Sequence, residues 1–305
     1  MIEIFFKKIN EKKFSKIDEI KKGAWVSLVN PTTDEVEKIS NELALDLTIV
    51  NDALDPYEMP RVEVEDGIKY IFARYPVKKG ETIETEPSLV IITEDNFITI
   101  AKHQLPVFHH FETNDINTTQ RAKLFIHFLK AINEEFNKFV HLISKQVKTA
   151  SSNLEGIENR DITRFVEYER VLNDFLYALI PSNMVFERIL HGKTLKLFEQ
   201  DEDLVEDLTL SNSQLIEMCK ANLKYIVNIR EAYSTILSNN LNKTMKILTS
   251  VTVLLTIPTI VFSYFGMNVT LPFQNHALAT FIITTLTLSL MLVLVLAFFK
   301  GKLFK

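Results

Sequence analysis

Residues 247–265 of the chain read ILTSVTVLLTIPTIVFSYF, and residues 277–299 read ALATFIITTLTLSLMLVLVLAFF. These two stretches decide the fold class, because no Lys, Arg, Asp or Glu interrupts them or the loop between them. A helix of about 20 residues, at about 1.5 Å per residue, spans the hydrocarbon core of a bilayer. We therefore predict a hairpin of two transmembrane helices. The alternative is a buried hairpin of a soluble fold, but two such long uncharged runs are hard to bury in 305 residues.

The basic residues around these stretches predict their orientation. Lysines lie before the first span and after the second, whereas the connecting loop, residues 266–276, has neither Lys nor Arg. The flanking lysines are Lys243, Lys246, Lys300, Lys302 and Lys305. Cytoplasmic segments carry an excess of basic residues. We therefore expect a multi-pass protein of the cell (plasma) membrane with both termini in the cytoplasm.

The first span carries a stripe of small and polar residues at a spacing of three or four, which keeps them on one face of a helix. The stripe consists of Asn242, Met245, Thr249, Thr252, Thr256, Thr259, Ser263 and Gly266. Two interpretations remain open: small and hydroxyl side chains attach helices to one another, or they line a wet path. Pro258 lies off the stripe and leaves the carbonyl of Leu254 without its helical donor.

The overall composition excludes several classes of protein. The net charge of −5 gives no support to a nucleic-acid partner, and the single cysteine, Cys219, allows neither an intrachain disulfide nor a multi-cysteine zinc site. Glycine-rich phosphate loops, nucleophile elbows and His-Glu-x-x-His motifs do not occur. We therefore do not expect an enzyme or an organic cofactor.

The first hundred residues alternate between short strand and helix patterns. Strands are predicted at residues 2–7 and 24–29, and a helix at 31–45 with Thr33 as its N-cap. Two hairpins follow, one around Asp66-Gly67 and one around residues 94–96. This order predicts an α+β domain, a mixed sheet with helices packed on it.

The pattern after Pro106 is helical. Residues 118–151 and 157–192 have apolar residues at helical spacing and predict an antiparallel pair, with Pro181 as a kink or break in the second helix. A third pattern begins near Asp203 and runs into the first span, which predicts one helix of about 95 Å at about 1.5 Å per residue. A helix of that length needs partners, so we expect a bundle around a symmetry axis.

These patterns divide the chain into four segments. They are a cytoplasmic α/β domain with its helical pair at 1–200, the cytoplasmic part of a stalk helix at 201–246, two membrane helices at 247–299 and a basic cytoplasmic tail at 300–305.

One motif links the chain to a known family. Gly266-Met267-Asn268 ends the first of the two C-terminal spans, and the chain thereby resembles the CorA family of magnesium transporters, the two-transmembrane Gly-Met-Asn family of divalent cation channels. Residues 242–249 are similar to that family's approach to the pore helix. So are residues 50–55, followed by Pro60-Arg61-Val62-Glu63. The resemblance covers the whole chain in layout and is strongest over residues 206–268.

The resemblance implies a homopentameric funnel for divalent cation influx. Five first spans would line a pore, and five second spans would form an outer ring in the lipid bilayer. The transported ion would be Mg²⁺, with Co²⁺ or Ni²⁺ as further candidates, and cytoplasmic Mg²⁺ would control gating. Gly266, Met267 and Asn268 would form the selectivity filter. Met245 and Leu248 would form a hydrophobic gate, and both would line the pore with Asn242, Thr249, Thr252, Thr256, Thr259 and Ser263.

The chain departs from the family pattern in two places. The family's Met-Pro pair is replaced by Thr256-Ile257, with the proline displaced to Pro258, so the upper constriction is more polar. The loop after the tripeptide, residues 269–272, reads VTLP in place of Met-Pro-Glu-Leu and carries no carboxylate. An acidic ring outside the pore is therefore not expected.

A regulatory metal site is a further expectation. Asp207 matches the position where the family binds a regulatory Mg²⁺ between subunits, while its partner carboxylate stays open, with Glu94 and Asp95 as guesses. It belongs to an acidic cluster with Glu199, Asp201, Glu202, Asp203 and Glu206. The other interpretation is that carboxylates favour helix N-termini. His103, His109 and His110 could indicate a transition-metal site, but a surface loop explains them equally well.

Two other functions stay open at this point. The first is a zinc or broad divalent-metal transporter of the same architecture, because an all-oxygen filter can pass several hydrated ions. The second is a membrane-anchored sensor or enzyme whose hairpin serves only as an anchor.

Overall fold

The computed structural model describes residues 1–8, 11, 13–105, 107, 110–111, 116–152, 156–192, 197–269 and 278–299. Its contacts divide the chain into two units, Met1–Arg230 and Glu231–Lys305. This division falls within the predicted stalk segment. The basic tail, most of the predicted loop at 266–276, Pro106 and His109 lie outside the described residues.

The first unit contains a seven-stranded mixed sheet in the order β2-β1-β3-β7-β6-β5-β4. β3 and β7 pair in parallel, and every other neighbouring pair is antiparallel. The strands are β1 (Ile2–Phe6), β2 (Ser15–Ile17), β3 (Trp25–Val29), β4 (Arg61–Glu65), β5 (Ile68–Lys79), β6 (Thr82–Ile92) and β7 (Phe97–Ala101). The mixed sheet of the sequence analysis is confirmed.

Turn chemistry sets the register of the hairpins. Asp66 and Gly67 both have positive φ, 48° and 79°, as a tight two-residue hairpin between β4 and β5 requires. Gly80, with φ of 63°, turns β5 into β6, which runs to Ile92 just before the predicted hairpin turn at residues 94–96. β2 was not predicted, because a three-residue edge strand is too short for a periodic pattern.

Helices α1 (Thr33–Glu42) and α2 (Leu47–Asp52) pack on one face of the sheet. Val36 and Ile39 of α1 share a core there with Leu89 and Ile98. The N-cap is Thr32, and the prediction of Thr33 was wrong by one residue. Thr32 and Glu35 form a reciprocal capping box, which Thr33 could not form with that glutamate.

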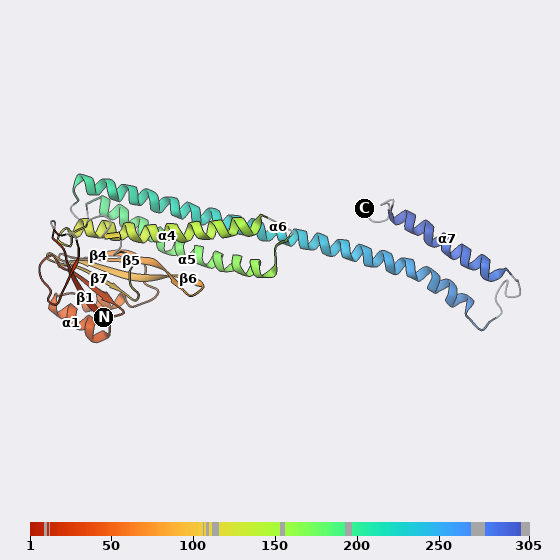
Figure 1. The fold of residues 1–305 in the computed structure, drawn as a ribbon, viewed down its shortest axis with the longest axis horizontal. Helices are drawn as coiled ribbons and strands as arrows, with labels where there is room; N and C mark the ends of the chain where they lie inside the picture. Colours follow the sequence, from red (N-terminus) through yellow and green to blue (C-terminus); the bar gives the residue numbers. More distant parts are fainter. Residues whose placement is uncertain are drawn as a thin grey trace. The chain divides into compact units, whose positions relative to one another are not determined.

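Two long helices cover the other face of the sheet: α4 (Arg121–Ser151) and α5 (Asn159–Leu190). Phe97 of the sheet meets Phe128 of α4, with ring centroids 6.4 Å apart. The helices are antiparallel, as predicted, since Phe136 contacts Phe175 while Gln146 binds Tyr168 (Figure 1). Pro181 was predicted to kink or break the second helix; it lies inside α5, which continues through it, so a break does not occur.

Helix α6 (Glu199–Phe265) begins in the first unit and continues into the second as one element of 67 residues. Its first part packs in the helical layer, where Cys219 is buried and its thiol pKa is raised to about 12 by that burial. Helix α7 (Ala279–Phe299) follows. Both α6 and residues Ala279–Ala297 of α7 contain a window long and apolar enough to cross a membrane.

Candidate functional site

The predicted pore-lining stripe lies on the last part of α6, where all its side chains are exposed in the single chain. The partly covered residues of this part recur at the same spacing of three or four. They are Ser250, Leu254, Ile257, Pro258 and Val261. At about 100° of rotation per residue, the covered line lies roughly opposite the stripe. The partly covered residues thus form one line on α6, and both the stripe and the apolar residues beside it, such as Val251 and Leu255, are exposed in the described chain.

Helix α7 has a covered line of its own. Thr287 is only 3% exposed. The other members, partly covered, include Ala279, Ile283, Thr284, Met291, Leu294 and Val295. Residues 279, 283, 287 and 291 follow one face of a helix at a spacing of four. These lines are the faces that α6 and α7 would turn toward each other within the second unit, which leaves the stripe on the far side of α6.

The threonine hydroxyls of the stripe donate to the backbone of the preceding turn. Thr252 Oγ1 lies 2.9 Å from the carbonyl oxygen of Leu248, Thr256 Oγ1 lies 2.8 Å from that of Thr252, and Thr259 Oγ1 lies 2.8 Å from that of Leu255. A hydroxyl has one proton and two lone pairs. Because the proton is used inside the helix, each hydroxyl oxygen can act only as a hydrogen-bond acceptor toward groups outside the helix.

The Gly-Met-Asn tripeptide follows the last residue of α6. The Gly266 amide donates to the carbonyl oxygen of Phe262 at 2.9 Å, and the side chains of Met267 and Asn268 are exposed. A glycine at this position permits either a positive φ at the helix end or a close approach of the backbone. Gly266 is not among the residues with positive φ. A Cβ at this position would lie 3.0 Å from the Phe262 oxygen, which is a tight contact.

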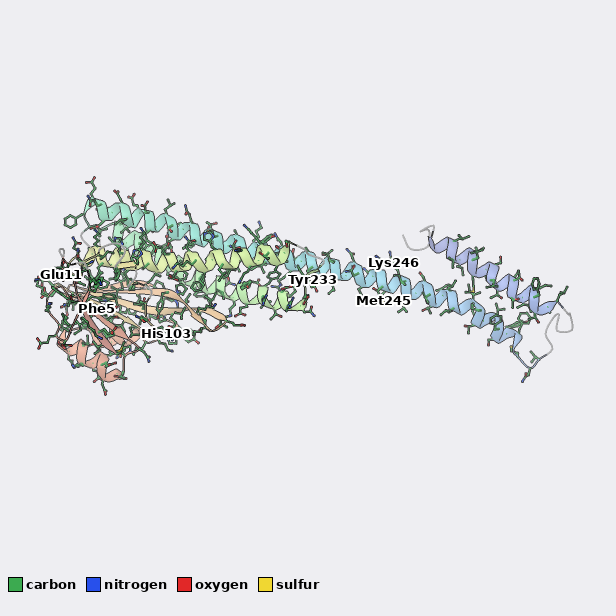
Figure 2. The ribbon with its side chains drawn as sticks, in the orientation of Figure 1. Phe5, Glu11, His103, Tyr233, Met245 and Lys246 are labelled. Carbon is green, nitrogen blue, oxygen red and sulfur yellow. The ribbon has the colours of Figure 1, made fainter. Side chains whose placement is uncertain are left out.

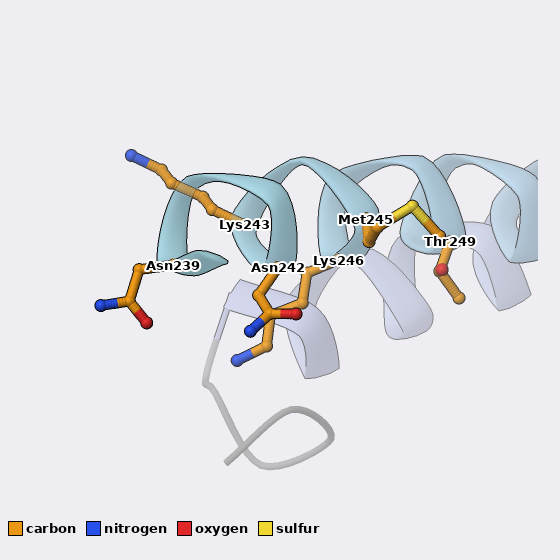
Figure 3. Close-up of a pocket in the computed structure, with 6 residues that line it drawn as sticks. All are labelled: Asn239, Asn242, Lys243, Met245, Lys246 and Thr249. Atoms are coloured by element: carbon orange, nitrogen blue, oxygen red, sulfur yellow. The ribbon is translucent and has the colours of Figure 1, made fainter. Parts of the chain in front are cut away.

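A hollow of about 480 Å³ opens beside the start of the apolar segment on α6. Three of its six lining residues, Asn242, Met245 and Thr249, belong to the predicted stripe, and the others are Asn239, Lys243 and Lys246 (Figure 3). Met245 is 52% exposed and Leu248 is 58% exposed, and Figure 2 places Met245 and Lys246 next to each other on α6. The sequence analysis missed Asn239, although its position three residues before Asn242 extends the stripe by one turn.

The proposed regulatory carboxylate is exposed on an acidic stretch of helix. Asp207 lies on α6, and among the described residues no group of three or more His, Cys, Asp or Glu side chains could hold a metal ion. A single carboxylate can bind Mg²⁺ only if water or another chain supplies the remaining ligands, as Mg²⁺ sites often allow. Asp95, one of the guessed partners, pairs with Lys22 at 2.7 Å.

The histidines predicted as one possible metal site have different partners. His103 Nδ1 lies 2.5 Å from Glu86 Oε2, beside the hydroxyl of Tyr75 (Figure 2). His110 instead lies 3.2 Å from His127, through Nε2 and Nδ1. His109 is outside the described residues. In the part of the chain that is described, these contacts do not assemble a metal centre.

Comparisons with known proteins agree on one family. The family model described as "CorA-like Mg2+ transporter protein" matches residues 21–300. The chain is 22% identical over 299 residues to the cobalt/magnesium transport protein CorA of Methanocaldococcus jannaschii, covering 93% of each chain.

Solved structures share the fold. The complete structure of the CorA magnesium transporter from M. jannaschii aligns with a TM-score of 0.85 at 19% identity, covering 98% of this chain and 97% of that chain. The ZntB cytoplasmic domain from Vibrio parahaemolyticus aligns with a TM-score of 0.65 at 8% identity, covering 78% and 98%. At such identities the likeness concerns the fold alone. It extends to the soluble α/β domain, the long helix and the C-terminal helix.

Proposed function

The chain belongs to the CorA-like Mg²⁺ transporter family, and from this premise we propose that it carries Mg²⁺ into the cell through a pore formed by five copies of α6. The observation that carries the proposal is the exposed stripe of α6, which lies opposite the covered face and ends at Gly266-Met267-Asn268. The polar, exposed face of a membrane helix needs contact with water or with another protein surface. A closed ring of α6 helices gives this face both a water-filled pore and neighbouring helices.

Selection would act on the hydrated ion. Mg²⁺ gives up water reluctantly, so a filter can bind the water shell through neutral acceptors without removing it. A ring of Asn268 side chains at the end of α6, with backbone carbonyls around Gly266, has this chemistry. The exposed positions of Asn268 and Met267 in the single chain support this assignment. Co²⁺ and Ni²⁺, which also carry tightly held water, are further candidate substrates.

The wet path would continue along the threonines of α6. Thr252, Thr256 and Thr259 donate their protons within the helix, which leaves their oxygens as acceptors. The protons of cation-bound water point away from the ion, so they require acceptors. Thr249 and Ser263 extend the same face, and Asn242 with Asn239 would form an amide vestibule at the cytoplasmic end.

The gate would lie between this vestibule and the threonines. Met245 and Leu248 are exposed apolar side chains on the stripe side of α6. Apolar rings of this kind can block ions by dewetting without closing sterically. Mg²⁺ bound at Asp207 between neighbouring subunits would hold the ring closed, and its loss at low cytoplasmic Mg²⁺ would let the pore open. Such coupling is negative feedback by linkage.

The membrane arrangement follows the charge pattern. Residues 247–265 and 277–299 would cross the cell membrane as a hairpin, with the soluble domain at 1–200, the stalk at 201–246 and the basic tail at 300–305 in the cytoplasm. Influx through a passive pore would be driven by the negative interior potential, at about 2.3 kcal/mol per charge per 100 mV.

The test is Mg²⁺ uptake into proteoliposomes loaded with a Mg²⁺-sensitive dye. Uptake by the native protein, blocked by an inert hexaammine complex that mimics the hydrated ion, is the expected result. Asn268→Ala should abolish uptake, whereas Val269→Ala, the neighbouring exposed residue, should retain it. Uptake of Zn²⁺ but not Mg²⁺ would establish the zinc alternative. If neither ion moves, or if Asn268→Ala matches the native protein, the hairpin is an anchor and the pore assignment fails.

A further inference from the structure

A second hollow, of about 420 Å³, lies in the soluble unit where α4 and α6 begin. Thr119, Arg121 and Lys123 line it from the start of α4, and Phe198 and Asp201 line it from the start of α6. Both helices begin at the same end of the helical layer (Figure 1). The volume falls in the range of small-molecule sites, and the ion pathway proposed above uses none of these residues.

The α4 side of the hollow is built for an anion. The N-cap residue, Gln120, makes no side-chain hydrogen bond to the first turn, and that turn contains no acidic residue. Arg121 and Lys123 stand there instead, so two cations add to the positive end of a helix of 31 residues. Free backbone N–H groups at such an end bind phosphate readily. Neither Arg121 nor Lys123 forms an ion pair with any residue that the structure describes.

The α6 side supplies a carboxylate that lacks a cation. Asp201 is 8% exposed, and among the described residues its carboxylate has neither a hydrogen bond nor an ion pair. Its backbone N–H donates to the carbonyl oxygen of Phe198 at 2.8 Å, which fixes the first turn. Its oxygens are nevertheless not fully buried, so the carboxylate is open to the hollow. Asp201 and the two basic residues line one hollow without pairing with each other, so the space between them fits a ligand that carries both signs of charge.

The rim of the hollow carries an aromatic ring that is almost fully in solvent. Phe198 is 80% exposed, one of the most exposed large apolar side chains of the first unit. A planar base can stack on such a ring, and stacking does not depend on which base it is. Folding alone gives no reason to leave this phenyl group in water.

We propose that this hollow binds a nucleoside polyphosphate together with its divalent cation. The phosphates would contact Arg121, Lys123 and the N–H groups that open α4, the cation would bind Asp201, and the base would stack on Phe198. The assignment stands on its own and does not require that the chain transports Mg²⁺. If the chain transports Mg²⁺, it would also bind the complex of Mg²⁺ with a nucleotide.

The test is a titration of the full-length protein in detergent with a fluorescent ATP analogue, with and without Mg²⁺. Arg121→Gln and Lys123→Gln should each weaken binding about tenfold, because each removes a charge-assisted contact worth about 1.4 kcal/mol. Lys145→Gln, an exposed lysine farther along α4, should have no effect. The fluorescence of Trp25 checks that every variant is folded.

Two further variants separate the parts of the ligand. Asp201→Asn should remove the gain in affinity that Mg²⁺ gives while leaving metal-free binding in place. Phe198→Ala should weaken ATP about tenfold and leave tripolyphosphate unchanged. Absence of saturable binding at millimolar ATP overturns the proposal, as does binding that Arg121→Gln and Lys123→Gln do not weaken. Equal affinity for tripolyphosphate and ATP, with Phe198→Ala silent, overturns the nucleotide assignment and leaves an anion site.

Discussion

The pKa of His127 depends on burial in the fold, which the local sequence does not reveal. Its side chain is 7% exposed on α4, and burial, together with the neighbouring His110, lowers its pKa to about 4. Lys130 and Lys123 of the same helix act in the same direction, while Glu134 lies 3.2 Å from the far nitrogen of His110. The imidazole is therefore neutral in the folded chain at pH 7, as it is in the unfolded chain.

This pKa predicts a loss of stability in weak acid. Between pH 6.5 and pH 4 the unfolded chain binds a proton at His127 that the folded chain does not, so the free energy of unfolding falls as the pH falls through that window. The loss is at most about 3 kcal/mol, since one pKa unit is worth about 1.4 kcal/mol. Urea unfolding followed by the single tryptophan at several pH values measures it.

The control for this prediction is His127→Gln, which keeps a polar side chain but cannot titrate. The difference in the free energy of unfolding between the native chain and this variant should change by up to about 3 kcal/mol between pH 7 and pH 4. Carboxylates titrate in the same window, but they do so in both proteins and cancel in the comparison. A difference that stays constant across the window would mean that His127 is not buried as a neutral group.

Two single positions depend on local geometry. Thr32 and not Thr33 caps α1, because the reciprocal bond needs a glutamate three residues later, and Glu35 fits only Thr32. At Gly266 residue type allowed both a positive φ and a close backbone approach; φ is not positive, and a Cβ would lie 3.0 Å from the Phe262 oxygen. Residue type alone does not distinguish these two roles.

At the scale of the element, α6 could be predicted from the sequence because the patterns that indicate it extend over many residues. Hydropathy over about 20 residues and the absence of Gly or Pro up to Pro258 both extend over many turns, so single exceptions do not change the result. The short elements β2 and α2 were missed because three or six residues contain too little periodicity. The stripe was predictable, but the covered line opposite it was not, since coverage depends on a second helix.

The proposed gate on α6 gives a prediction for Leu248. Replacing it by Asn turns the Leu248 ring of the gate into a ring of amides, so water remains in the constriction and the closed pore should leak. We expect Leu248→Asn to raise Mg²⁺ uptake at high internal Mg²⁺ severalfold over the native protein. The matched control is Ile247→Asn, the same change about 100° around the helix. Equal uptake by both variants and the native protein would remove Leu248 from the gate.

At the scale of the whole molecule, the sequence and the single chain both leave the assembly open. The described chain offers an unpartnered stripe, an exposed carboxylate at Asp207 and no metal group of three or more ligands. Each of these is incomplete by itself and would be completed by a copy of the same chain around an axis. The length of α6 predicted a bundle around a symmetry axis, but the number of copies could not be read from it, because a symmetric contact has no signature in local periodicity. Only the family resemblance predicted five copies.

The proposed Mg²⁺ site at Asp207 can be tested by limited digestion. If Mg²⁺ binds between subunits at this carboxylate, millimolar Mg²⁺ should protect the stalk of the native protein from trypsin, because the bound ion joins neighbouring helices. Asp207→Asn should raise the Mg²⁺ concentration for half protection about tenfold, corresponding to about 1.4 kcal/mol of lost binding free energy. Glu206→Gln is the control, since the neighbouring carboxylate points about 100° away on the same helix. If both variants shift the midpoint equally, protection reflects general screening of an acidic helix end. A midpoint that neither variant shifts would place the regulatory ion elsewhere, and the proposed feedback would then need another carboxylate.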